Sequence, residues 1–309
     1  MRKLKMAKKN KDSNKEKDII INELSEENHK NSAEKEDTKE LSYEERELYQ
    51  EKYDIKPSHG IRTKYLILSS QRTGSTYITR RLCNVKDKFG MPSEYLNRRA
   101  ISLMIQRIFP NEIKGKSDKP QGFGIGKYMD GIQKIRTTAD GYFGIKAQPH
   151  QIMRIANGKA AIAMEFINQF DQVILITRKN KLSQAISLSL AALTGKWSVD
   201  DRKDTKLNDK EQSIIYPLVL NNLNQLIKED QFIMSIGKAF QKPNIHLEYE
   251  EIESDSNAAF KRITDFISNN STEKFEETSA ISIPKKIVTE LTLELEKNFT
   301  DFITGTYKK

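Results

Sequence analysis

The 309-residue chain carries a formal net charge of +9, with 31% charged and 37% hydrophobic residues. No run approaches the ~18 apolar residues of a membrane-spanning helix, so the sequence predicts no membrane span. The basic amino terminus lacks the apolar segment of a signal peptide, which favours a cytoplasmic location. The single cysteine, Cys83, excludes an internal disulfide and a cysteine-rich metal site, and its position in a predicted helix indicates a buried thiol.

The charge is unevenly distributed along the chain. Residues 1–60 are close to neutral, and residues 1 to about 40 contain few apolar side chains, so we predict that residues 1–60 form a charged extension that is disordered or helical. Residues 61–309 therefore carry almost all of the positive charge and are predicted to form one domain. A basic domain suits an anionic ligand. Nucleic acid is not favoured, because no basic stripe with interleaved aromatics, zinc-finger spacing or helix-turn-helix pattern is found.

A strand-loop-helix pattern opens this domain. The apolar run 65–68 is typical of a buried strand, the loop 69–76 is rich in small residues, and a helical pattern follows. Such a loop presents the free N–H groups and the positive dipole end of a helix to an anion. Gly74 would allow close approach of a phosphate, and Ser75 and Thr76 would add hydroxyl donors. The alternative is an ordinary turn in which serine caps the helix.

The loop differs from the G-x-x-x-x-G-K-[ST] loop of nucleotide triphosphatases. Ser69 stands where the first glycine would be, and no lysine separates Gly74 from Ser75. The cation is Arg72 instead, whose planar guanidinium can bind two oxygens at once.

A second strand-to-helix unit lies further along the chain. The apolar run 173–176 is typical of a parallel strand, Arg178 follows its carboxyl end, and Ser183 and Ser187 share one face of the next helix. Strands at 141–147 and 244–251 complete the predicted sheet. Helices are predicted over 75–84, 100–109, 150–169, 214–240 and 260–267, and another contains Ser183 and Ser187 and ends near Gly195. The glycine-rich residues 122–127 are interpreted as a connection. These elements predict an α/β fold of P-loop-like, three-layer type, with a central parallel sheet flanked by helices.

Three segments resemble one family. Residues 71–76 are similar to the Q-R-[ST]-G-S-T phosphosulfate loop of sulfotransferases, and residues 91–97 to the P-x-E-[YF]-[FL] segment of the bacterial trehalose 2-sulfotransferase-like branch. Residues 183–187, Ser-Gln-Ala-Ile-Ser, also resemble that branch. The resemblance implies transfer of a sulfuryl group from 3′-phosphoadenosine 5′-phosphosulfate (PAPS) to a hydroxyl of a carbohydrate or glycolipid, without a metal ion.

The resemblance also implies residue roles. The 5′-phosphosulfate would be held by Arg72, Thr73, Gly74, Ser75 and Thr76. The 3′-phosphate would be held by Arg178 and by one of two serines, Ser187 or Ser183. Glu94 would be the general base that takes the proton of the acceptor hydroxyl. Arg72 would stabilise the charge that develops on the leaving bisphosphate.

The acceptor side is less specific. The resemblance places Tyr95, Lys146, Gln148 and His150 near the acceptor. Lys146 is equally well explained as a structural lysine, and His150 is a second candidate base that ranks below Glu94.

Alternatives remain open from the sequence alone. The chain could be an ATP-dependent small-molecule kinase of P-loop type, or a nucleotide-binding relative without transfer activity. The possibility of an inactive relative arises because only Lys285 and Lys286 stand where the family has a carboxyl-terminal basic segment. Relatives often dimerise, so a homodimer is an additional expectation.

Overall fold

The structure is a computed structural model that describes residues 48–55, 60–111, 124–197, 206–269, 276–283 and 289–305. The predictions for the first part of the extension and for Lys285 and Lys286 lie outside these residues. The strands are β1 (Thr63–Ser69), β2 (Tyr142–Ala147), β3 (Gln172–Thr177) and β4 (Asn244–Glu248). The helices before β3 are η1 (Glu51–Tyr53), α3 (Ser75–Cys83), α4 (Lys86–Phe89), α5 (Arg98–Ile108), α6 (Ile125–Arg136), α7 (Pro149–Ile155) and α8 (Ala160–Ile167). Those after it are α9 (Lys181–Thr194), α10 (Asp209–Ala239), α11 (Tyr249–Ser254), α12 (Ser256–Ile267) and α13 (Glu290–Thr304).

The four strands form one parallel sheet in the order β2-β1-β3-β4. Leu68 of β1 lies opposite Ala147 of β2 on one side and opposite Leu175 of β3 on the other. The chain leaves β1 toward one neighbour and later returns to the other, so the strand order reverses beside β1. In open parallel sheets, ligands bind at the carboxyl ends of the strands where the order reverses. The predicted α/β fold with a central parallel sheet is confirmed.

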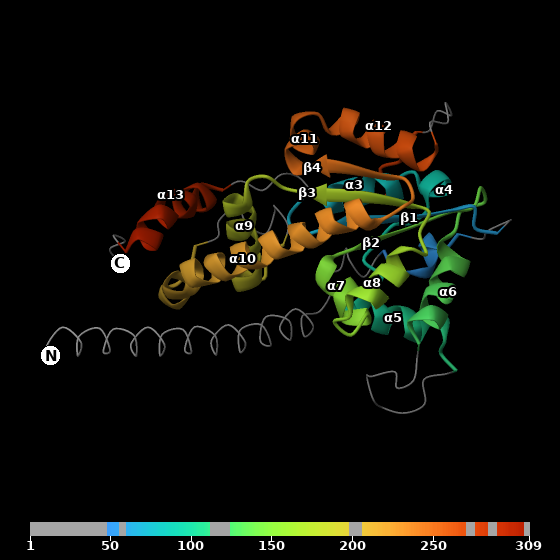
Figure 1. Ribbon diagram of the computed structural model, residues 1–309, viewed down its shortest axis with the longest axis horizontal. Coiled ribbons are helices and arrows are strands. Elements are labelled where there is room, and N and C mark those ends of the chain that lie inside the picture. Colours follow the sequence, from blue (N-terminus) through green and yellow to red (C-terminus); the bar gives the residue numbers. More distant parts are fainter. Residues whose placement is uncertain are drawn as a thin grey trace, which may run out of the picture. The chain divides into compact units, whose positions relative to one another are not determined.

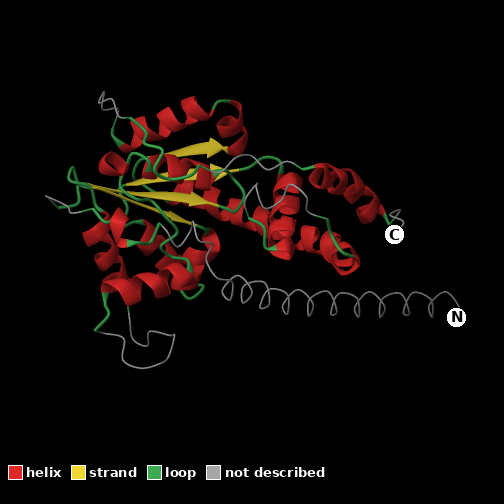
Figure 2. Ribbon diagram, turned by 180° about the vertical axis from the view of Figure 1, so that it is seen from behind, coloured by secondary structure: helices red, strands yellow, loops and turns green. Residues whose placement is uncertain are grey.

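Helices cover both faces of the sheet, and α10 and α12 lie on opposite sides of it (Figures 1 and 2). Tyr65 and Ile67 of β1 pack on one face in a cluster that includes Ile78 of α3 and Ile263 of α12. On the other face, α10 approaches so closely that a Cβ at Gly237 would lie 2.6 Å from Leu175 Cδ1. Because both faces are buried, the strands β2 and β3 are continuous runs of buried residues rather than alternating ones.

Two segments differ from the predicted helices. The predicted helix over 150–169 is wrong as one element, because α7 and α8 are separated by a turn. Asn157 and Gly158 in this turn have φ of 51° and 74°, which a right-handed helix cannot accommodate. The connection predicted at 122–127 is wrong at its end, because α6 begins at Ile125.

Residues 48–55 pack against the domain that follows them. The ring of Tyr49 contacts Tyr95 edge-on, with centroids 5.9 Å apart. The guanidinium of Arg136, which is fully buried, donates to the Tyr53 carbonyl at 3.0 Å. The division into a 1–60 extension and a 61–309 domain stays a prediction, but this part of the extension contributes to the core.

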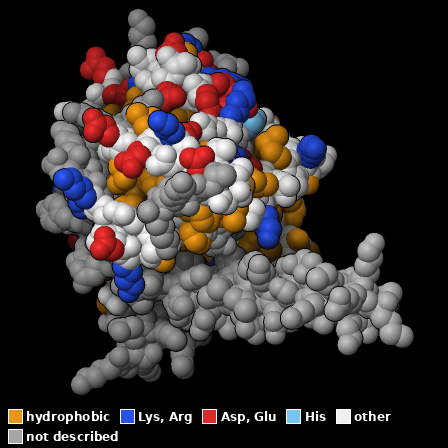
Figure 3. Space-filling model, turned by 90° about the vertical axis from the view of Figure 1, so that its left-hand side faces the viewer, with side chains coloured by type: hydrophobic (Ala, Val, Ile, Leu, Met, Phe, Trp, Pro, Cys, Tyr) orange, Lys and Arg blue, Asp and Glu red, His pale blue; other side chains and the backbone are white. Residues whose placement is uncertain are grey.

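The surface of the protein is polar (Figure 3), and its single thiol is buried. In the part of the chain that the structure describes, none of the helices has the length and apolar character needed to cross a bilayer. Side chains of both charges are interspersed with hydrophobic ones on the face shown in Figure 3. Cys83 is 2% exposed, and burial raises the pKa of its thiol to about 12, so the predicted buried thiol is confirmed.

Candidate functional site

The turn between β1 and α3 is shaped to receive an anion. Gly74 caps α3 without a side-chain hydrogen bond to the first turn. The first N–H groups of a helix have no partner within the helix, so they remain available to a ligand, and the helix dipole adds to their attraction for negative charge. Thr73 is fully buried and braces the turn, because its hydroxyl donates to the Ser70 carbonyl at 3.0 Å.

Glycine is required at position 74 for two reasons. Its φ is 73°, in the left-handed region that residues with a Cβ rarely adopt. In addition, a Cβ at this position would lie 3.2 Å from Cδ2 of Tyr249. The residue after β4 therefore packs directly on the turn after β1.

Arg72 points from the first turn toward the helix that follows β3. Its Nε donates to Ser187 Oγ at 3.1 Å, and its Nη1 donates to the Trp197 carbonyl at 3.4 Å. Its own backbone has φ of 61°, which is uncommon outside glycine and is characteristic of strained functional turns.

Arg178, at the carboxyl end of β3, meets the first turn. Its Nη1 donates to the Arg72 carbonyl at 3.3 Å, and its Cζ lies 4.3 Å from the ring centroid of Tyr249. The Nε of Arg178 is buried and has no hydrogen-bond partner among the described residues. The two arginines singled out from the sequence thus lie at one site, with Tyr249 contacting both turns.

The two candidate serines on α9 have different partners. Ser187 is 8% exposed and accepts the hydrogen bond from Arg72. Ser183 instead donates to both carboxylate oxygens of Glu296 on α13, at 3.0 Å each. Because a carboxylate repels phosphate, the geometry favours Ser187 over Ser183 as a phosphate ligand.

Three backbone N–H groups of the turn between β3 and α9 donate to side chains of the chain itself. Glu250 on α11 accepts from the backbone N–H groups of Lys179 and Asn180 at 3.1 and 3.0 Å. The Asn180 side chain accepts from the N–H of Ser183 at 3.0 Å and so caps α9. Burial would raise the pKa of Glu250, but the backbone hydrogen bonds and Arg178 lower it below its ordinary value.

Glu94 lies in a ring of donors at the other side of the first turn. Its Oε1 is 2.7 Å from the ammonium of Lys146. Its Oε2 accepts from the amides of Gln151 at 2.9 Å and Gln148 at 3.3 Å. Burial would raise the pKa of Glu94, but Lys146, the Gln151 hydrogen bond and the nearby His150 together lower it, so the carboxylate is ionised at neutral pH.

Lys146 links the Glu94 carboxylate to the turn between β1 and α3, which we call the phosphate loop. Besides its ion pair with Glu94, its Nζ donates to Thr76 Oγ1 at 2.8 Å, and the side chain is only 5% exposed. A buried ammonium that bridges these two groups places positive charge between the start of α3 and the candidate base. This position suits negatively charged oxygens.

Two predicted acceptor residues lie differently from the others. Tyr95 is fully buried, and its hydroxyl donates to the Met91 carbonyl at 2.6 Å, so the structure does not bring it to the site. His150 lies at the edge of the site, with Nδ1 3.4 Å from Oε1 of Glu229 on α10.

Several supporting contacts could not be predicted from the sequence. Gln151 belongs to the segment 148–151 that the resemblance places at the substrate, but its direct contact with Glu94 was not predicted. Behind the phosphate loop, Ser70 donates to Asp230 Oδ1 at 2.9 Å and accepts from the Gln184 amide at 3.1 Å. Asp230 also pairs with Lys181. The two contacts of Ser70 join residues more than 100 positions apart, which a single sequence does not signal.

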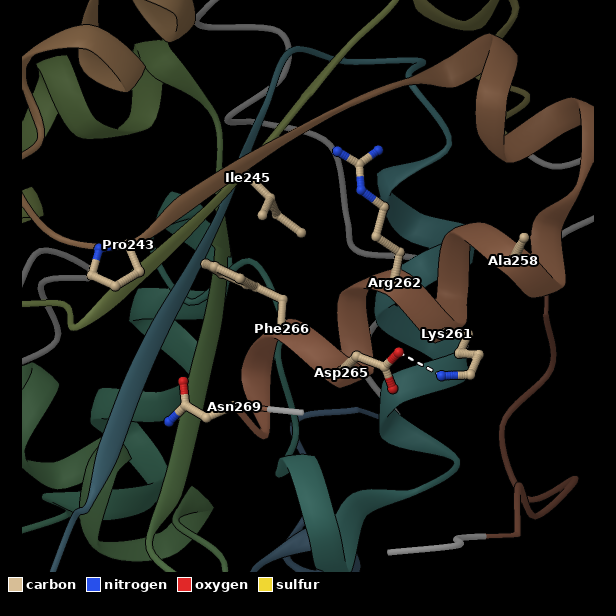
Figure 4. A pocket seen from close by; sticks show the side chains of 8 residues that line it. All are labelled: Pro243, Ile245, Ala258, Lys261, Arg262, Asp265, Phe266 and Asn269. Atoms are coloured by element: carbon tan, nitrogen blue, oxygen red, sulfur yellow. Dashed lines mark hydrogen bonds and ion pairs between the residues drawn. The ribbon is translucent and has the colours of Figure 1, made fainter. Parts of the chain in front are cut away.

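Among the described residues, no group of three or more His, Cys, Asp or Glu side chains could hold a metal ion. A pocket of about 600 Å³ lies between β4 and α12, and none of the predicted site residues lines it (Figure 4). The charged side chains there are paired, Lys261 with Asp265 and Arg262 with Glu251.

The arrangement defines a class of protein: an α/β fold with a glycine-containing turn suited to an anionic group and an ionised carboxylate next to it. The sequence profile of the Stf0 sulphotransferase family matches residues 64–228, more than half of the chain. The chain belongs to this family and is a sulfotransferase.

Solved structures with partial likeness include three proteins. A sulfotransferase from Alicyclobacillus acidocaldarius is 15% identical with a TM-score of 0.42, and the match covers 79% of this chain and 94% of that one. The sulfotransferase domain of the Synechococcus PCC 7002 olefin synthase is 16% identical with a TM-score of 0.34, over 79% and 97% of the two chains. Retinol dehydratase in a complex with retinol and PAP is 12% identical with a TM-score of 0.38, over 84% and 83%. No curated protein sequence matches this chain.

Proposed function

We propose that this sulfotransferase transfers a sulfuryl group from PAPS to a hydroxyl of a carbohydrate or glycolipid, with Glu94 as the general base. The observation that carries the proposal is the contact between the two strand-to-helix turns, where Arg178 donates to the Arg72 carbonyl at 3.3 Å. PAPS carries anionic groups on both sides of its ribose. Two cationic turns in contact match one such molecule, whereas a nucleotide without a 3′-phosphate would leave the second turn unused.

The donor would lie with its 5′-phosphosulfate at the first turn and its 3′-phosphate at the second. The backbone N–H groups after Gly74 and the hydroxyls of Ser75 and Thr76 suit the phosphosulfate. Arg178 and Ser187 suit the 3′-phosphate, and the unpartnered buried Nε of Arg178 supports this assignment because such a donor is costly without an acceptor. Ser183, directed at Glu296, is not required.

The transfer moves one proton, forms one sulfur–oxygen bond to the acceptor and breaks another to the leaving nucleotide. The acceptor oxygen forms a bond to sulfur while its proton passes to Glu94. The bond between sulfur and the bridging oxygen breaks, and that electron pair leaves with 3′,5′-bisphosphoadenosine. Lys146, between Glu94 and Thr76, would stabilise the sulfuryl oxygens and the leaving oxygen as charge redistributes. Each group is fixed before reaction, so little reorganisation is needed.

The acceptor would approach Glu94 from the side of α7. Gln148 and His150 present an amide and an imidazole there, which are groups that hydrogen-bond hydroxyls. These polar neighbours support a polyhydroxylated acceptor, and Tyr95 is omitted from the acceptor site because it is buried.

Donor identity can be tested by ligand-dependent thermal stabilisation. A ligand present at 100 times its dissociation constant stabilises by about 2.7 kcal/mol, which shifts the melting temperature measurably. We expect 3′,5′-bisphosphoadenosine to stabilise the protein more than ATP or AMP at equal concentration. A larger effect of ATP with magnesium, together with ATP consumption, would instead identify a P-loop kinase.

The base can be tested by replacing Glu94 with glutamine. Loss of a general base costs roughly 10²–10⁴-fold in rate. We expect Glu94→Gln to lose that factor in turnover of labelled donor with a carbohydrate acceptor, while the affinity for 3′,5′-bisphosphoadenosine stays within about twofold. Unchanged turnover would remove Glu94 from the mechanism. Donor binding by the wild-type protein without turnover on any glycan would identify an inactive relative.

We also propose that the protein is a homodimer. Leu220, Ile227 and Met234 are 38%, 40% and 39% exposed and recur every seven residues along α10. This spacing returns to the same helix face, which a second copy could cover. A monomeric mass in light scattering would contradict this proposal. A cytoplasmic location also stays a prediction.

A further inference from the structure

Gln151 is held so firmly beside Glu94 that its side chain has only one orientation. It is 2% exposed and lies on α7, one turn after Gln148. Its Oε1 accepts from the backbone N–H of Gln148 at 3.1 Å, and its Nε2 donates to Glu94 Oε2 at 2.9 Å. Because a backbone N–H can only donate, the oxygen of the amide must face Gln148 and the nitrogen must face Glu94.

The two oxygens of Glu94 are therefore not equivalent. An ionised carboxylate has about four acceptor positions, two on each oxygen. Oε2 receives two amide donors, from Gln151 at 2.9 Å and from Gln148 at 3.3 Å. Oε1 receives only the Lys146 ammonium at 2.7 Å from among the described residues, so one acceptor position remains on it.

We propose that Gln151 is a positioning residue that saturates Oε2 of Glu94, so that the acceptor's proton is taken by Oε1. This inference rests on the proposed role of Glu94 as the general base. Oε1 faces Lys146, and Lys146 contacts Thr76 at the start of α3. The oxygen left open is thus the one on the side of the phosphate loop, where the sulfuryl group would lie.

Gln151 also favours the ionised form of Glu94, because its hydrogen bond to Oε2 is stronger when the carboxylate carries a negative charge than when the acid is neutral. The other charged and titratable groups around Glu94 are Lys146 from β2 and His150 from α7, and both act in the same direction. Glu94 takes a proton only when it is ionised, so activity falls as the pH drops through its pKa. Loss of the Gln151 donor should raise that pKa and move the acid limb of kcat/KM to higher pH. A hydrogen bond to a charged group corresponds to a shift of about one pH unit.

The experiment compares Gln151→Met with Gln172→Met across the pH profile. Gln172 is a matched control, because it is 3% exposed and donates to the Phe266 carbonyl at 2.9 Å, at the opposite end of the strands. We expect Gln151→Met to move the acid limb up by about one pH unit, with affinity for 3′,5′-bisphosphoadenosine within about twofold of wild type. Gln172→Met should lower the melting temperature and leave the limb unchanged. An unmoved limb in Gln151→Met would overturn the proposal.

Further variants keep the result interpretable. If Gln151→Met fails to fold, Gln148→Met replaces it, with a smaller upward shift expected because its bond to Glu94 is longer at 3.3 Å. A limb that stays in place in that variant too would overturn the proposal. In His150→Gln the acid limb should persist, because Glu94 is the group that titrates. Disappearance of the limb in this variant would assign it to His150 instead. Failure of the proposed base is distinguished by Glu94→Gln: retained turnover refutes the base, whereas lost turnover with an unmoved Gln151→Met limb refutes only the role of Gln151.

Discussion

The turn after β1 and the turn after β3 start from the same strand-to-helix geometry but differ in what occupies their amides. At the first turn, Gly74 caps α3 with no side-chain hydrogen bond, so the backbone itself is open to an anion. At the second turn, Glu250 and the Asn180 side chain already accept from the backbone N–H groups. The second turn can therefore bind an anion chiefly through side chains, Arg178 and Ser187. Two sites that look alike in sequence thus use backbone in one case and side chains in the other.

The largest expected effect comes from Gly74→Ala, which distorts the turn that presents backbone N–H groups to the donor. The added Cβ would lie 3.2 Å from the Tyr249 ring, at a φ of 73° that alanine rarely adopts. Distortion of the turn should displace the N–H groups from the donor, and loss of such donors costs roughly 10²–10³-fold in kcat/KM. Steady-state kinetics with labelled PAPS measure this.

Gly158→Ala is the matched control for that variant. Gly158 has φ of 74°, almost the same as Gly74, but a Cβ there would meet nothing within 4 Å. Both substitutions should cost about 1 kcal/mol of stability from backbone strain. Only Gly74→Ala should lose donor binding, and an equal loss in both would attribute the effect to strain alone.

The second effect in size tests the side-chain site through Arg178→Ala. A lost charge-assisted contact of 1.5–3 kcal/mol corresponds to roughly 10–10²-fold in affinity. We expect the affinity for 3′,5′-bisphosphoadenosine to fall by this factor. The affinity for AMP, which has no 3′-phosphate, should change little. Calorimetric titration of both ligands measures the difference. Arg262→Ala, on the exposed surface of α12, serves as the control for loss of one positive charge. Equal weakening of both nucleotides would contradict the assignment of Arg178 to the 3′-phosphate.

How far the sequence predicts each part depends on the range of the interactions involved. The strands and both turns could be predicted, because apolar runs, Gly74 and the arginine after each strand are local signals. The break between α7 and α8 also had a local signal, since Asn-Gly at 157–158 is a turn dipeptide. The pairing of Ser183 with Glu296 and of Glu94 with Gln151 could not be predicted. These contacts depend on how separate helices pack, and nothing in the adjacent residues encodes that. Tyr95 shows the same limit, because its neighbour Glu94 reaches the site while Tyr95 points into the core.

A smaller effect separates the two serines of α9. Ser187→Ala should lower the affinity for 3′,5′-bisphosphoadenosine by about five- to tenfold. One neutral hydrogen bond contributes about 1 kcal/mol, and Arg72 also loses its hydrogen bond to Ser187. Ser183→Ala, one helical turn away, should leave the affinity within about twofold because its hydroxyl contacts Glu296. Direct binding measurements compare them. The reverse order would show that Glu296 is displaced when the donor binds.

The smallest effect concerns the carboxylate that fills the amides of the second turn. Glu250→Gln retains one carbonyl acceptor but loses the other, so stability at neutral pH should fall by roughly 0.5–1 kcal/mol. Because the pKa of Glu250 is depressed in the folded protein, its stabilising contribution is complete above the ordinary glutamate pKa. The contribution disappears as the pH falls through the folded-state pKa.

Urea unfolding at several pH values measures this effect. The stabilities of wild type and Glu250→Gln should differ at pH 7 and converge in acid. The control is Glu251→Gln on the same helix, which pairs with Arg262 at the surface and should change stability by less than about 0.5 kcal/mol. Improved anion binding at the second turn in Glu250→Gln would show that the amide it vacates can bind a ligand. That result would support occupancy by Glu250, rather than backbone geometry, as the difference between the two turns.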